Sequence, residues 1–171
     1  LSRYRGPNLR GYEKSELGRL SDFQVNIFYL IFGFLKLLYG GKELAVKRLI
    51  VGITGGSGVI YGVRLLEALK IAGVETDLII TKWGKVTLSM ETDYSLTDVK
   101  QIASYYHDEN NLAASISSGS FLHDGMIIAP CSMKTLGEIA TGISNDLVSR
   151  AADVTLKENK KLLLLARETP M

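Results

Sequence analysis

Glycine and hydroxyl residues suited to holding an anion follow the first apolar run of the chain. That run, residues 47–54, ends in a Gly-Gly-Ser-Gly turn at 55–58, and a helical pattern begins at Val59. Glycines let a backbone approach a phosphate closely, and the amides at the start of the following helix point towards it. The turn therefore predicts a phosphate site, with a tight strand-to-helix turn that binds nothing as the alternative.

The surroundings of this turn argue against two common nucleotide sites. No Gly-Lys-Ser or Gly-Lys-Thr follows it, as a P-loop would require. The second predicted strand ends at Thr81 and Lys82, where an NAD site would carry an acidic residue for the ribose. The pair better suits a phosphate or the edge of a flavin.

A second polar segment, residues 130–135, follows the third predicted strand. Ser132 is expected to cap the next helix, leaving Lys134 and Thr135 to face an anion or a polar ring edge. An ordinary cap beside a solvated lysine is the alternative. Cys131 is interpreted as a packing residue rather than a nucleophile, because no Cys/His pairing is visible.

Other polar groups permit weaker predictions. Residues 115–121 carry four serines around a glycine, which could bind phosphate or flavin or form a flexible loop. His107 and His123 lack the spacing of metal ligands, so no metal site is expected. Arg150 and Lys157 lie seven residues apart and can share a helix face with Asp153, either as part of a site or as a structural salt-bridge network.

These residues are positioned by alternating strands and helices. Runs rich in β-branched or aliphatic residues predict buried strands, and 3.6-residue periodicity predicts helices. Gly73 is expected to end the first helix, and Ser95 with Asp98 to form a capping box. The order predicts an α/β domain with a parallel sheet. The expected strands are 47–54, 75–81, 124–130 and 161–166, and the expected helices are 59–72, 83–91, 95–106, 132–142 and 145–158.

Composition sets broad limits on the 171-residue chain. Residues 1–48 hold nine Lys and Arg against four Asp and Glu, whereas the remainder holds eleven against fourteen. The mildly acidic remainder argues against function through bulk attraction to nucleic acid. A lone cysteine fits a reducing compartment such as the cytoplasm. Residues 23–39 are apolar but interrupted, and fit a non-native extension, an amphipathic packing helix or a membrane anchor.

Residues 47–171 resemble the flavin prenyltransferases of the UbiX type, formerly called phenylacrylic acid or 3-octaprenyl-4-hydroxybenzoate carboxy-lyases. The matching strings are KRLIVGITGGSGVIYGVRLLEAL, ETDYSL, AASISSGSF, PCSMKTL, RAADVTLKE and RETP, in the expected order. The resemblance implies a flavodoxin-like, Rossmann-type three-layer sandwich that assembles into a homo-oligomer, typically a dodecamer, with FMN at subunit interfaces. It also implies that dimethylallyl phosphate is joined to reduced FMN, at N5 and C6, for use by a partner decarboxylase of the ubiquinone-biosynthesis type.

The resemblance further implies roles for individual residues. Cations around an allylic phosphate would stabilise its departure, and a carboxylate could relay its proton, without a metal. The residues implied to bind flavin are Gly55, Gly56, Ser57, Thr81, Ser132, Met133, Lys134, Thr135 and Arg167. Those implied to be catalytic are Glu91, Arg150, Lys157 and Glu168.

The chain departs from the family pattern at both ends. Residues 1–46 have no counterpart in the family and are expected to form an N-terminal extension. The family continues past RETP to a Tyr and a basic residue that hold the prenyl phosphate, so C-terminal truncation and poor transfer are expected. Two alternatives are a phosphopantothenoylcysteine-type decarboxylase, disfavoured by RAADVTLKE and RETP, and a non-catalytic FMN-binding fragment.

Overall fold

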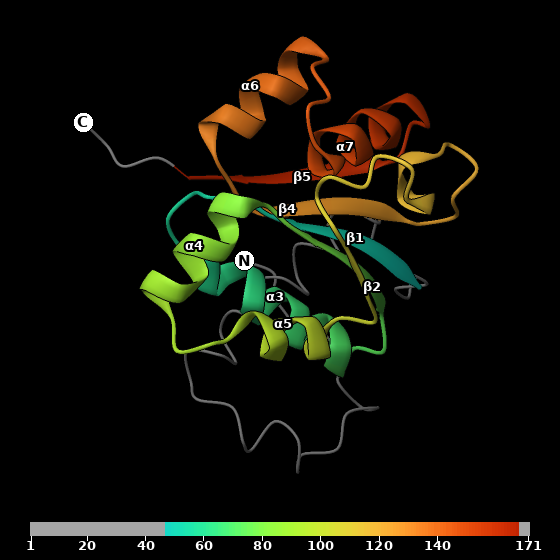
Figure 1. Cartoon of the computed structure of the whole chain (residues 1–171). Coiled ribbons are helices and arrows are strands. Elements are labelled where there is room, and N and C mark those ends of the chain that lie inside the picture. The colour runs from blue at the N-terminus through green and yellow to red at the C-terminus, as the bar shows by residue number, and fades with distance from the viewer. Residues whose placement is uncertain (1–46, 168–171) are drawn as a thin grey trace, which may run out of the picture. The chain divides into compact units, whose positions relative to one another are not determined.

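A computed structural model of the chain describes residues 47–167 (Figure 1). The expectations for residues 1–46 and for Glu168 lie outside the described residues. The strands are β1 (Arg48–Ile53), β2 (Glu75–Ile80), β3 (Tyr105–His107), β4 (Gly125–Cys131) and β5 (Lys161–Ala166). The helices are α3 (Val59–Ile71), α4 (Lys82–Glu91), α5 (Leu96–Ile102), α6 (Met133–Thr141) and α7 (Leu147–Lys157), with a 3-10 turn at Ser115–Ser117. None of the described helices is long and apolar enough to cross a membrane.

The five strands form one parallel sheet in the order β3-β2-β1-β4-β5. The chain builds outward from β1 through β2 to β3, and then returns to the other side of β1 with β4 and β5. Neighbouring β1 and β4 therefore mark the topological switch point, where ligands bind beyond the ends of the strands in such sheets.

Helices cover both faces of the sheet. Figure 1 shows α3 and α5 on one face and α6 and α7 on the other. Every residue of β4 is buried, as expected for a strand packed on both faces. On the α7 face, Ile50 and Ile128 belong to one buried cluster with Val148 and Ala151. The predicted three-layer α/β sandwich with a parallel sheet is confirmed.

Local sequence signals set several helix ends as predicted. Gly73 has φ 69°, and its amide donates to the Lys70 carbonyl at the end of α3. Ser95 and Asp98 form the expected capping box of α5. Ser132 caps α6 by accepting from the Thr135 amide.

The predicted helix 95–106 was wrong at its C-terminal end. The helix stops at Ile102, and Tyr105–His107 adds a fifth strand beside β2. The Ser104 hydroxyl accepts from the Thr76 amide at 3.1 Å, and the Thr76 hydroxyl accepts from the Ser104 amide at 3.2 Å. This reciprocal pair lies just before the strand contacts and depends on a partner 28 residues away, which a local helical period does not reveal.

Candidate functional site

Thr54 joins the two polar segments at the switch point. Its buried hydroxyl donates to the Pro130 carbonyl at 2.8 Å and accepts from the Ser132 amide, also at 2.8 Å. The Thr54 amide donates to the same carbonyl at 3.2 Å. These bonds fix the end of β1 against the end of β4. Thr54 is not among the site residues predicted from the sequence, although a hydroxyl directly before a glycine turn is a signal for it.

The glycine turn is packed too closely for larger residues at two positions. A Cβ on Gly55 would lie 2.5 Å from the Trp83 Cβ, at the start of α4. Gly58 has φ 90°, in the left-handed region that favours glycine. A Cβ on Gly56 would be 3.6 Å from the Ser132 amide nitrogen, so the turn runs alongside the second polar segment. Exposed Ser57 stands between these glycines.

Glu91 and Arg167 flank the start of α3. The Glu91 carboxylate accepts from the Gly58 amide at 2.8 Å and from the Val59 amide at 3.3 Å. The Arg167 amide donates to the Cys131 carbonyl, and its side-chain Nε lies 3.9 Å from where a Gly58 Cβ would stand. The amides that the sequence predicts for an anion therefore already receive a carboxylate oxygen, with a guanidinium close by.

The start of α4 has a similar arrangement. Thr81 caps the helix by accepting from the Gly84 amide at 3.1 Å. The Glu109 carboxylate accepts from the Lys82 amide at 2.6 Å and from the Lys85 ammonium at 3.1 Å. Glu109 follows β3, a strand that the local sequence pattern does not predict, so no sequence signal could place Glu109 here.

The segment after β4 presents hydroxyls and a lysine. The Thr135 amide donates to the Ser132 hydroxyl at 3.3 Å, and their two hydroxyl oxygens are 3.1 Å apart. Exposed Met133 and Lys134 follow in the first turn of α6. Cys131 is fully buried, and burial raises the pKa of its thiol to about 11. The thiol is therefore protonated at neutral pH, which agrees with a packing role.

Two predicted cations lie apart from each other on α7. Arg150, one turn from the start of the helix, pairs with Asp153 at 3.1 Å. Lys157 ends the helix, about 10 Å further along its axis. The next strand begins at Lys161, opposite the first residue of β4. Lys157 thus lies on the amino side of the sheet, away from the glycine turn of its own chain.

The serine loop and the histidines are used within the fold. Ser118 and Ser120 bond to each other at 2.9 Å. The His107 Nε2 lies 2.8 Å from the buried Asp77 carboxylate, and the His123 Nδ1 lies 3.1 Å from a backbone carbonyl. Within residues 47–167, no group of three or more His, Cys, Asp and Glu could hold a metal ion.

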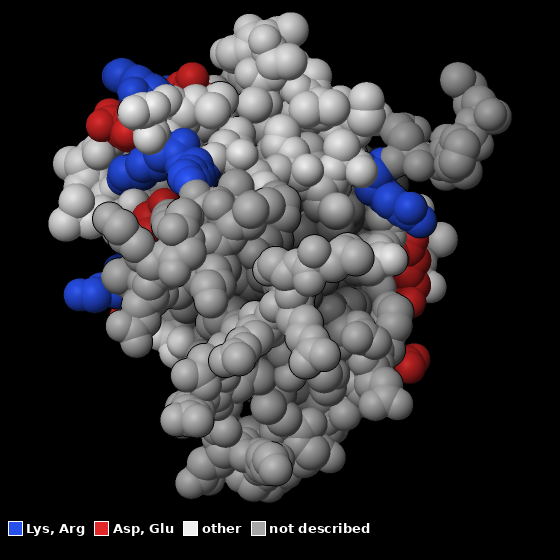
Figure 2. Space-filling view, turned by 180° about the vertical axis from the view of Figure 1, so that it is seen from behind, with Lys and Arg blue, Asp and Glu red and all other residues white. Residues whose placement is uncertain are grey.

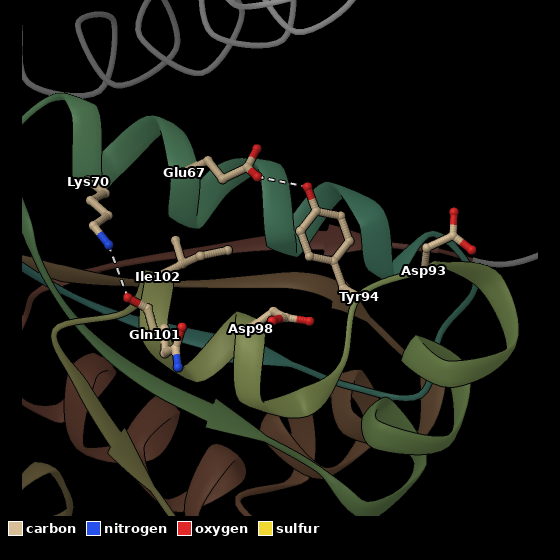
Figure 3. A pocket seen from close by; sticks show the side chains of 7 residues that line it. All are labelled: Glu67, Lys70, Asp93, Tyr94, Asp98, Gln101 and Ile102. Atoms are coloured by element: carbon tan, nitrogen blue, oxygen red, sulfur yellow. Dashed lines mark hydrogen bonds between the residues drawn. The ribbon is translucent and has the colours of Figure 1, made fainter.

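A pocket of about 540 Å³ between α3 and α5 lies away from these segments (Figure 3). Several of its polar residues form hydrogen bonds within the fold: Tyr94 donates to Glu67 at 2.9 Å, and Lys70 donates to the Gln101 carbonyl at 3.0 Å. We assign it no ligand.

On the face drawn in Figure 2, the visible basic and acidic side chains of the described residues lie beside each other rather than in patches of one sign.

Comparison with known proteins decides the family. The model of the flavoprotein family matches residues 40–171. A probable UbiX-like flavin prenyltransferase of Bacillus subtilis is 57% identical over 132 residues, which cover 77% of this chain and 63% of that protein. The crystal structure of AnUbiX (PadA1) with FMN and dimethylallyl pyrophosphate has 49% identity and a TM-score of 0.72, with 74% of this chain and 67% of that chain covered. The chain belongs to the UbiX flavin prenyltransferase family.

A second solved structure supports the same membership. The dodecameric FMN-dependent Ubix-like decarboxylase of Escherichia coli O157:H7 is 53% identical, with a TM-score of 0.71 and coverage of 72% of this chain and 68% of that one. The chain spans 63% of the length of the Bacillus subtilis relative, which is less than two thirds. The family predicted from the sequence motifs is confirmed.

Proposed function

We propose that residues 47–171 form the FMN-binding domain of a flavin prenyltransferase, which joins dimethylallyl phosphate to reduced FMN. The observation that carries the proposal is the Thr54 junction, which brings the glycine turn and the Ser132 segment together at the switch point. A relative of 49% identity binds FMN and a dimethylallyl ester in its crystal structure.

The residues present fit a flavin phosphate. The Gly58 and Val59 amides donate to the Glu91 carboxylate, so they are oriented towards an anionic oxygen, and a flavin phosphate bound there would displace that carboxylate. Arg167 supplies positive charge beside this turn, and Lys134 supplies it beside Ser132. The full proposed flavin set is Gly55, Gly56, Ser57, Thr81, Ser132, Met133, Lys134, Thr135 and Arg167.

We propose that the remaining residues act on the prenyl phosphate. When bound, reduced FMN would supply the nucleophilic ring positions. Arg150 and Lys157 would stabilise the charge of the departing phosphate, and Glu91 and Glu168 would hold or move its proton. Because Lys157 lies on the amino side of its own sheet, it would serve the site of a neighbouring copy. A homo-oligomer is thus part of the proposal, supported by the dodecameric Escherichia coli relative.

The proposed setting follows from the same family. The product would be prenylated FMN for a partner decarboxylase of the ubiquinone-biosynthesis type. The single cysteine of the chain is a free thiol, which supports a reducing compartment such as the cytoplasm.

The test is binding followed by turnover with the whole chain. FMN affinity is measured by fluorescence titration. The complex is then reduced anaerobically, mixed with dimethylallyl phosphate or the pyrophosphate, and examined for prenylated flavin by mass spectrometry. Binding with product formation supports the proposal. Binding without product favours the FMN-binding fragment, and folded protein that binds no FMN overturns both.

A further inference from the structure

Glu138, in the middle of α6, is a buried carboxylate with one oxygen unused. The residue is 7% exposed. Its Oε1 accepts from the Lys134 ammonium at 3.0 Å and from the Asn145 amide group at 3.0 Å. Its Oε2 is buried and has no hydrogen-bond partner among the described residues. A buried charged oxygen without a donor costs stability, so this side chain is a poor choice for packing alone.

Helix stability does not account for the pair of Lys134 and Glu138 either. A lysine in the first turn of a helix faces the positive end of the helix dipole, which is unfavourable. The order Lys then Glu at i and i+4 is also the weaker orientation of such pairs. Both donors to Glu138 converge on one oxygen, and its bond to Lys134 is the main cause that raises the pKa of that lysine. The contacts of Glu138 therefore fix the position of the Lys134 ammonium and add little to the stability of the helix.

Lys134 lies at the edge of the proposed flavin site. Lys134 lies in the same turn as Ser132 and Thr135, directly beyond the Thr54 junction. Its side chain is 68% exposed, so its remaining donors can reach a ligand. Glu109, which follows β3 and accepts from the Lys82 amide, and Asp146, the N-cap of α7, are further carboxylates that raise the pKa of Lys134.

We propose that Glu138 is a positioning residue that holds the Lys134 ammonium towards the polar edge or phosphate of the flavin. The inference rests on the proposed function. A lysine stem has many rotamers, and ordering it before the ligand arrives lowers the entropic cost of binding. Glu138 itself is buried behind the lysine and acts only through it.

The experiment is a double-mutant cycle on FMN affinity, using E138L, K134M and E138L/K134M in the full chain. E138L is expected to weaken FMN binding about tenfold, within the range of coupling between contacting residues. It should leave the unfolding midpoint unchanged or raise it, because the orphaned oxygen is removed. In the K134M background, E138L should have no further effect on FMN affinity. Equal weakening in both backgrounds, or none in either, overturns the proposal.

Two further variants separate positioning from packing. E138Q keeps an acceptor oxygen for Lys134 and should restore at least part of the FMN affinity, whereas a pure packing defect would not follow the acceptor. N145A removes the other donor to the same oxygen and should leave FMN affinity unchanged. Without FMN, NMR titration of Lys134 should show its pKa falling in E138L. If the wild-type chain binds no FMN, the proposed function and this inference both fail. If it binds FMN but E138L leaves the FMN affinity unchanged, only the inference fails.

Discussion

Thr54 and Ser132 are joined by a 2.8 Å hydrogen bond across 78 positions of the chain, with the Thr54 hydroxyl accepting from the Ser132 amide. The same hydroxyl donates to the Pro130 carbonyl. One buried side chain thereby sets the spacing of the two segments that form the proposed flavin site.

Thr54→Val is expected to weaken both folding and FMN binding. The change is nearly isosteric, but it leaves the part-buried Ser132 amide without its acceptor, which costs about 1 kcal/mol. The Pro130 carbonyl keeps its bond from the Thr54 amide. Urea unfolding and FMN titration measure the two effects. Thr54→Ser, which keeps the hydroxyl, is the control; wild-type behaviour of the valine variant would contradict the assigned role.

Ser57→Asp is expected to reduce FMN affinity at the glycine turn. The exposed side chain stands at the start of α3, and a carboxylate there would repel the flavin phosphate. Stability should fall slightly, because the Glu91 carboxylate already accepts from the neighbouring Gly58 amide and would repel a second carboxylate. Ser57→Asn is the uncharged control of similar size. Retention of FMN at the wild-type level by Ser57→Asp would place the phosphate elsewhere.

Cys131→Ala is expected to cost about 1 kcal/mol of stability, as for a small buried side chain, and to leave turnover intact. The native thiol has a pKa of about 11, against an ordinary value of 9.0. Above pH 9 the unfolded state releases this proton more readily than the native state, so the contribution of the thiol to stability declines between about pH 9 and 11. The free energy of unfolding, measured across this pH range, should therefore fall less steeply in the alanine variant than in the wild type. Loss of turnover in a folded, flavin-bound variant would instead assign chemistry to Cys131.

Asp77→Asn is expected to destabilise the fold by about 1.5–3 kcal/mol, the usual cost of losing hydrogen bonds to a charged group, because the Arg48 side chain that is left is partly exposed. The carboxylate is fully buried between Arg48, at 2.7 Å, and His107, at 2.8 Å. Glu75→Gln is the matched control, because that carboxylate lies 3.7 Å from the same arginine but is 54% exposed. Chemical denaturation should show a small effect for the control. Equal effects of the two variants would contradict the burial argument.

The same aspartate predicts an acid-sensitive fold. Burial would raise the pKa of Asp77, but hydrogen bonds from His107 and Arg48, with their charge, outweigh it and lower the pKa below its ordinary value. A lowered native pKa gives stability that is present above the ordinary aspartate pKa and lost as the pH falls through the native value. Stability measured against pH should therefore decline more steeply in acid for wild type than for Asp77→Asn. Parallel profiles would show that Asp77 is not linked to acid unfolding.

The sequence by itself determined the order of the helices and of four of the five strands, several helix ends and the family. Buried strands read as apolar runs, Gly73 and Ser132 mark helix ends through chemistry within three or four residues, and the family motifs are contiguous strings. Each of these signals is local, so each survives without knowledge of the fold.

Only the tertiary structure decided how the site is assembled. Three features depend on which elements pack together. They are the hydrogen bond from the Ser132 amide to Thr54, the contact of the Glu91 carboxylate with the Gly58 amide before α3, and the buried Glu138 oxygen without a hydrogen-bond partner among the described residues. The strand Tyr105–His107 likewise exists because β2 offers it an edge. Such long-range hydrogen bonds and burial leave no periodicity in the sequence, and they are what turns separate motifs into one candidate flavin site.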